Sequence, residues 1–146
     1  MDIKNLFKYK GLYWCTVALL VALHFVFSFT LSSSATYNSG ISFGIGAGEF
    51  NQSYLILLLV NSFVLLGLVY LIVKLYIKKD LVFELYLLII LFIAGLLNFY
   101  DRIVYNAVRD YVSVLGLDFN IPDVIIVFVA MIYIVSLLLR KEQNGK

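Results

Sequence analysis

Most of the side chains that could perform chemistry lie in one segment of the chain, from Asn98 to Asp123. This segment contains four aspartates and two arginines, and it separates two strongly apolar runs. An ionised aspartate at the centre of a bilayer costs roughly 2.5–3.5 kcal/mol, and it costs less near the interface. Because the chain is 63% hydrophobic and only 14% charged, we expect such a cluster to have a function.

Carboxylates are the main catalytic groups that the chain offers. The only histidine is His24 and the only cysteine is Cys15, so we expect neither a Ser–His or Cys–His pair nor a metal site of the usual kind. His24 is expected to be a buried, hydrogen-bonded helix residue. When two carboxyl groups are held together, the ionised one can take a proton from water while its protonated partner polarises a carbonyl group. Asp110 and Asp123 form such a dyad if the chain between them folds back onto the last apolar run.

Two simpler interpretations compete with a dyad. The charged residues could form a solvated loop, and Asp118 is assigned to that class because nothing around it suggests a partner. Helix capping alone could also explain Asn120 and Asp123, since Asn120 suits the N-cap position and Asp123 the third helical position. Pro122 fits the first turn, where its missing N–H costs nothing.

The rest of the sequence predicts an integral membrane protein. Its mean hydropathy of +0.99 excludes an ordinary soluble domain. Apolar runs of about 18 residues are typical of membrane-spanning helices, and the alternating pattern of a barrel is absent. We predict one all-α membrane domain over residues 1–146, with four transmembrane helices at about 12–31, 54–77, 81–97 and 124–139.

The basic residues predict the orientation of these helices. Lys and Arg are enriched in the cytoplasmic loops of membrane proteins. They occur before the first apolar run, between the second and third, and after the fourth, whereas residues 31–53 contain none. We therefore expect both termini in the cytoplasm and both long polar segments on the extracytoplasmic side. The net charge of +2 reflects this orientation and is not a nucleic-acid-binding footprint.

The polar segment from Ser32 to Ser53 is rich in Ser, Gly and Asn. It lacks the lysine of a phosphate-binding loop, so we expect a turn or short strand that carries Asn38 toward the other polar segment. The chain start, together with the small residues Ser33, Ser34 and Ala35, also resembles a secretory signal. Its apolar core is longer than the usual ~7–15 residues, so we expect the first span to be retained.

Four short motifs follow one another along the chain. They are Asn-x-Gly-x-x-Phe at Asn38, Gly40 and Phe43; Asn-x-x-Asp-Arg at Asn98, Asp101 and Arg102; Val-x-Asp-aromatic at Val108, Asp110 and Tyr111; and Phe-Asn-x-x-Asp at Phe119, Asn120 and Asp123. In order and spacing they resemble the motifs of the prokaryotic lipoprotein signal peptidases (signal peptidase II), a family of four-helix membrane aspartic proteases.

This resemblance implies that Asp110 and Asp123 are the catalytic aspartates. It implies that the dyad or the substrate is positioned by Asn38, Gly40, Asn98, Asp101, Arg102 and Asn120. The implied activity removes signal peptides from diacylglyceryl-modified prolipoproteins, cutting before the lipidated cysteine at the outer boundary of the cell membrane. The implied partners are these precursors and membrane lipids, without nucleic acid, cofactor or metal.

Two other functions stay open. A non-catalytic protein of the same fold, which binds lipopeptides or assists membrane assembly, is favoured by departures from the family pattern. The first span has His24 and Ser28 roughly where the family has Asp and Lys, and Asn106 stands where glycine is usual. A small ion transporter would require charges within the spans, where Asn61 is the only candidate and helix packing explains it more simply.

The two arginines of the polar segment are expected to differ in importance. Arg102 follows Asp101 directly, which favours an orienting or ion-pairing role, and it shares a helical face with Asn98 four residues earlier. Continuing the helix would bring Asn106 and Asp110 onto this face. Lysine cannot reproduce the planar fork of arginine, so we expect Arg102→Lys to lose most activity. Arg109→Lys is expected to be mild.

Overall fold

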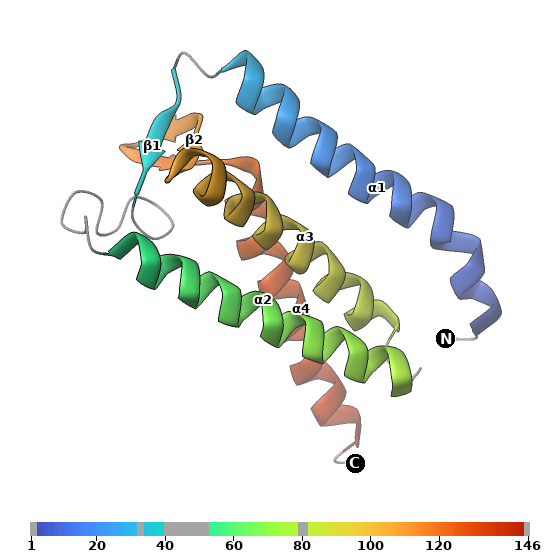
Figure 1. The fold of residues 1–146 in the computed structure, drawn as a ribbon. Coiled ribbons are helices and arrows are strands. Elements are labelled where there is room, and N and C mark those ends of the chain that lie inside the picture. Colours follow the sequence, from blue (N-terminus) through green and yellow to red (C-terminus); the bar gives the residue numbers. More distant parts are fainter. Residues whose placement is uncertain (1–2, 32–33, 40–52, 79–81, 145–146) are drawn as a thin grey trace.

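The computed structural model describes residues 3–31, 34–39, 53–78 and 82–144 (Figure 1). Four long helices account for most of this part of the chain: α1 (Ile3–Thr30), α2 (Ser53–Lys78), α3 (Val82–Tyr105) and α4 (Ile121–Asn144). Four short strands complete it: β1 (Thr36–Asn38), β2 (Val108–Asp110), β3 (Val112–Val114) and β4 (Leu117–Phe119).

Each helix is long and apolar enough to cross a membrane, which confirms the predicted four-helix class. The candidate spans are Tyr13–Thr30, Tyr54–Lys78, Phe83–Tyr105 and Ile121–Lys141. Helices suit these runs because a helix satisfies its own backbone hydrogen bonds in lipid. Large apolar side chains such as Phe29, Phe63 and Phe128 are exposed on the outer faces, as expected for surfaces that meet acyl chains. The orientation of the spans stays a prediction.

Helix α3 forms the centre of the bundle. It packs against α2 and α4, and α1 lies along it as well (Figure 1). Its inward face is apolar along most of its length, with Leu88 and Ala94 almost completely buried. A Cβ atom at Gly95 would lie 3.1 Å from Leu65 Cδ2, so this glycine allows α2 and α3 to approach closely.

The predicted end of the third helix was wrong. Helix α3 continues past residue 97 to Tyr105, so Asn98, Asp101 and Arg102 lie in its last turns, and the helical face predicted for Asn98 and Arg102 is present. These polar residues remain helical because they share the inward face, while Ile103 on the outward face is exposed. The helix does not extend the shared face to Asn106 and Asp110: Asn106 has a φ of 57°, and Asp110 belongs to a strand.

The strands form a small cap over one end of the bundle. β1 pairs with β2 in antiparallel register, with Thr36 opposite Asp110 and Asn38 opposite Val108. The expected strand that brings Asn38 toward the second polar segment is thereby confirmed (Figure 1). β3 and β4 form an antiparallel hairpin, whose turn residues Leu115 and Gly116 both have positive φ. Turns of this kind match the twist of the strands that they join.

Candidate active site

The start of α4 is capped as the sequence predicts. Asn120 Oδ1 accepts a hydrogen bond of 2.9 Å from the backbone N–H of Asp123, and Asp123 Oδ2 accepts a longer one of 3.5 Å from the backbone N–H of Asn120. This reciprocal arrangement is that of a capping box. The hydroxyl of Tyr111 accepts a third hydrogen bond from the N–H of Ile121, so β2 and its flank are tied to the same helix terminus.

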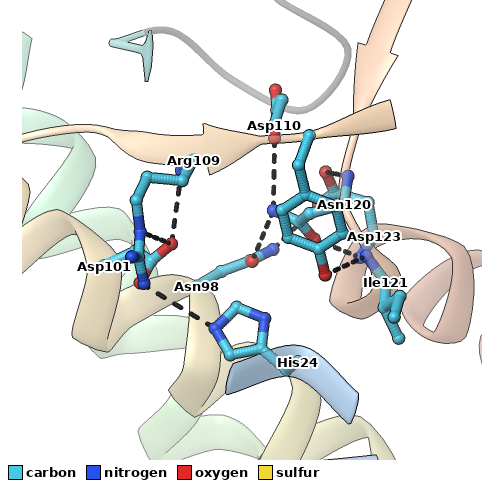
Figure 2. A network of polar contacts seen from close by, with 9 residues as sticks. His24, Asn98, Asp101, Arg109, Asp110, Asn120, Ile121 and Asp123 are labelled. Atoms are coloured by element: carbon cyan, nitrogen blue, oxygen red, sulfur yellow. Dashed lines mark hydrogen bonds and ion pairs between the residues drawn. The ribbon is translucent and has the colours of Figure 1, made fainter. Parts of the chain in front are cut away.

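Capping is only part of what Asn120 does. Its Nδ2 also donates to Asp110 Oδ1 at 3.2 Å and to Asn98 Oδ1 at 3.1 Å. Asn98 in turn donates through Nδ2 to Asp123 Oδ1 at 2.8 Å. The two asparagines therefore bridge the carboxylates of Asp110 and Asp123 (Figure 2).

Asn38 completes the surroundings of Asp110. Its Nδ2 donates to Asp110 Oδ2 at 3.0 Å, so both oxygens of this carboxyl group accept from amide side chains. Asp110 is 1% exposed and Asp123 is 3% exposed. A solvated loop would leave these groups in water, and the structure therefore contradicts that interpretation for both aspartates.

Burial alters the acidity of Asp110. Removal from water raises the pKa of this carboxyl group to about 6, and the nearby charge of Asp123 acts in the same direction. The hydrogen bonds from Asn38 and Asn120 favour the ionised form and limit the rise in pKa. Asp110 can thus hold a proton at a pH where an ordinary aspartate has lost it, as one member of a working carboxyl pair must.

The raised pKa of Asp110 predicts a pH-dependent difference in stability. Between the ordinary value of 3.8 and about 6, the folded protein keeps a proton on Asp110 that the unfolded chain releases. The folded state then binds more protons, so this contribution to the free energy of unfolding is complete at low pH and is lost as the pH rises through about 6. In thermal unfolding in detergent, the parent should therefore lose stability relative to Asp110→Asn over that range. A difference that does not change with pH would contradict this prediction.

A buried ion pair between Asp101 and Arg109 joins β2 to the end of α3. Asp101 Oδ1 lies 2.8 Å from Arg109 Nη2, and Asp101 Oδ2 accepts from both Nε and the backbone N–H of Arg109 at 3.2 Å. Burial lowers the pKa of Arg109, but its bonds to Asp101 and the charge of that residue outweigh burial and raise the pKa. The guanidinium carbon also lies 3.9 Å from the ring centre of Tyr105.

The predicted partner of Asp101 needs correction in this light. Adjacency in sequence favoured Arg102, but in the structure Asp101 pairs with Arg109. Neighbouring residues on a helix point about 100° apart, whereas β2 returns over the end of α3 and places Arg109 directly above Asp101. Arg109 was missed because only this strand pairing reveals it, although its position next to Asp110 was a usable signal.

Arg102 lies close to the two buried aspartates, although it does not pair with Asp101. Its side chain is buried, and the charges of Asp123 and Asp110 act on it. Its backbone carbonyl accepts a hydrogen bond of 2.7 Å from the hydroxyl of Tyr54, which joins α2 to α3. The structure thus brings together Asn38, Asn98, Asp101, Arg102, Asp110, Asn120 and Asp123, all of them predicted site residues.

The remaining predicted residues have mixed outcomes. Gly40 and Phe43 lie outside the residues that the structure describes. Asp118 was expected to have no partner, and this was wrong: its Oδ2 accepts a hydrogen bond of 3.0 Å from Thr36 Oγ1, across the space between β1 and the hairpin. His24 is buried as expected, but within the described part of the chain neither ring nitrogen has the expected hydrogen-bond partner. Among the described residues, no group of three His, Cys, Asp or Glu side chains could hold a metal ion.

Comparison with known proteins identifies the family to which the chain belongs. No curated protein matches the sequence. The fold is similar to that of a solved structure described as a bacterial membrane enzyme, with a TM-score of 0.72 and 21% identity over 94% of this chain and 93% of that one. Residues 6–139 match the family described as Signal peptidase (SPase) II. With its four membrane-spanning helices and this match over nearly its whole length, the chain belongs to the signal peptidase II family.

Proposed function

We propose that this signal peptidase is an aspartic endopeptidase in which Asp110 and Asp123 form the catalytic dyad. The observation that carries the proposal is the burial of both carboxyl groups in one network, bridged by Asn98 and Asn120. Buried carboxylates that serve only structure are usually paired with cations, as Asp101 is with Arg109. Asp110 instead accepts from neutral amides, which leaves it able to change protonation state.

The two carboxyl groups have different surroundings, which supports separate roles. Asp110, with its raised pKa, carries the proton that polarises the scissile carbonyl. Asp123 lies in the first turn of α4, where the helix dipole stabilises negative charge, and acts as the base that takes a proton from water. The hydroxide equivalent then attacks the carbonyl carbon while the proton of Asp110 moves to the carbonyl oxygen. Asp123 next passes the proton that it took from water to the amide nitrogen, the C–N bond breaks, and Asp110 recovers a proton from a hydroxyl group of the collapsing intermediate. Since the pair shares one proton, its measured pKa values belong to the dyad as a whole.

The other polar residues position these groups. Asn38, Asn98 and Asn120 hold the carboxyl groups through the hydrogen bonds described above. Asp101 and Arg109 fix β2, while Arg102 supplies positive charge beside the dyad. For Gly40 a role near the substrate backbone rests on the motif alone.

The substrates in this proposal are diacylglyceryl-modified prolipoproteins, cut just before the lipidated cysteine. The site lies at one end of four apolar helices, which suits a bond held at the membrane–water boundary (Figure 1). The basic residues favour the extracytoplasmic side of the cell membrane. A reporter fused after Gly48 or Asp118 should therefore be active outside, and one fused after Lys79 inside. A cytoplasmic signal from the Asp118 fusion would overturn this placement.

The direct test is cleavage of a defined substrate. Purified protein in detergent is incubated with a prolipoprotein peptide whose cysteine carries the diacylglyceryl group, and the products are identified by mass spectrometry. We expect a new amino terminus at the modified cysteine, and far less product from the same peptide without the lipid. Binding of the lipidated peptide without cleavage would instead favour the non-catalytic alternative.

A further inference from the structure

His24 is a buried histidine that the proposed chemistry does not use. It lies on α1, is 0% exposed, and neither of its ring nitrogens has a hydrogen-bond partner among the residues that the structure describes. Its Nε2 lies 3.9 Å from Asp101 Oδ1, and Figure 2 shows the ring directed from α1 toward that carboxylate. A polar group buried without a partner is unfavourable, so a residue that only filled space here would be better apolar.

Asp101 connects His24 to the strand that carries Asp110. Asp101 holds Arg109 by the side chain and by the backbone N–H, and Arg109 immediately precedes Asp110 in β2. Any side chain that fixes the Asp101 carboxylate therefore also fixes the strand that carries Asp110.

Two aromatic rings lie around the imidazole. The ring of Phe25 lies edge-on to it at 5.3 Å between centres, and the ring of Tyr111 lies 6.3 Å away. Tyr111 itself is stacked on Phe27 of the same helix. A shift of about 1 Å would bring Nε2 and Oδ1 within hydrogen-bond distance, with the imidazole N–H donating.

We propose that His24 is a positioning residue of the active site, which acts on Asp110 through Asp101 and Arg109. The proposal rests on the dyad function above, since its catalytic consequence is the placement of Asp110. It assigns to α1 a polar role in the site in addition to its aromatic contacts with Tyr111.

Two substitutions of His24 and one control test this proposal. His24→Leu fills the space without a donor, whereas His24→Gln keeps a side-chain N–H that can reach Asp101. Tyr13→Phe is the control. Tyr13 is also a buried polar residue of α1, and its hydroxyl has no partner among the described residues, but it stacks on Tyr86 away from the network. For each variant, kcat and KM are measured on the lipidated peptide, and hydrogen exchange is measured for the peptide covering residues 106–111.

We expect His24→Leu to lower kcat by about 10-fold to 100-fold with KM unchanged, as misplacement of a catalytic group by about 1 Å does. The peptide 106–111, which contains the Arg109 amide held by Asp101, should exchange faster in this variant, while His24→Gln and Tyr13→Phe should stay close to the parent in both measurements. Parent-like kcat and exchange in His24→Leu, or equal losses in all three variants, would overturn the proposal. If the parent itself does not cleave, the proposed function fails, and unchanged exchange of the peptide 106–111 in His24→Leu would then still refute the contact.

Discussion

Replacement of Asp110 or Asp123 by Asn is expected to reduce peptide cleavage by about 100-fold to 10,000-fold, the range typical of a lost general acid or base. Asparagine has nearly the same shape, but it can neither release nor take up the proton that the dyad must transfer. Both variants should remain folded, because the amide oxygen can still accept one of the hydrogen bonds from the neighbouring asparagines. Initial rates on the lipidated peptide and thermal unfolding in detergent are the measurements.

Asp118→Asn is the matched control for these variants. Asp118 lies in β4 close to the site, and its charge acts on Asp110, but its Oδ2 accepts a hydrogen bond from the hydroxyl of Thr36 that asparagine can also accept. We expect this variant to retain most of the parent activity. If Asp123→Asn were as active as Asp118→Asn, Asp123 would be a helix cap without a catalytic role.

Asp101→Asn should produce the largest loss of stability. Breaking a buried ion pair on one side leaves the other charge uncompensated, at a cost of about 3–5 kcal/mol. Here the uncompensated group would be the Arg109 guanidinium, which is almost fully buried and anchors β2 beside the dyad. Denaturant unfolding in detergent measures this loss directly, and cleavage should fall with it because Asp110 follows in the same strand.

Arg109→Lys examines the same pair with its charge retained. From sequence this substitution was expected to be mild, but Arg109 donates to both oxygens of Asp101, which the single ammonium of lysine cannot reproduce. We now expect a clear loss of both stability and activity. Arg140→Lys, near the far end of α4, provides the control for a general arginine-to-lysine effect. Equal behaviour of the two variants would show that the pair needs only a positive charge.

The sequence predicted the large elements well because apolar runs of membrane length have few alternatives. The predicted C-terminal boundary of the third helix was wrong because the last turns of this helix contain polar residues that face inward. Asn98 and Asp101 look like the start of a loop, yet partners from other elements keep them in the last turns of α3. The cap at Asn120 was predictable because its partner lies only three residues away.

Contacts between distant parts of the chain were predictable only where a motif marked both sides. Asn38 and Asp110 belong to two recognisable motifs, and the structure joins them by a hydrogen bond. No motif couples Asp101 to Arg109 or Thr36 to Asp118, because the first contact depends on how the chain turns from α3 into β2 and the second joins strands of two different sheets. Neither arrangement has a local pattern in the sequence.

The wide distribution of the site along the chain has a consequence for biosynthesis. Asn38 precedes α2, Asn98 lies near the end of α3, and Asp123 is in the first turn of α4. A ribosome makes these segments in that order, so a nascent chain with three helices in the membrane still lacks one carboxyl group of the proposed dyad. If the proposed dyad is correct, the newly made peptidase gains its hydrolytic capacity only when its last helix has been inserted.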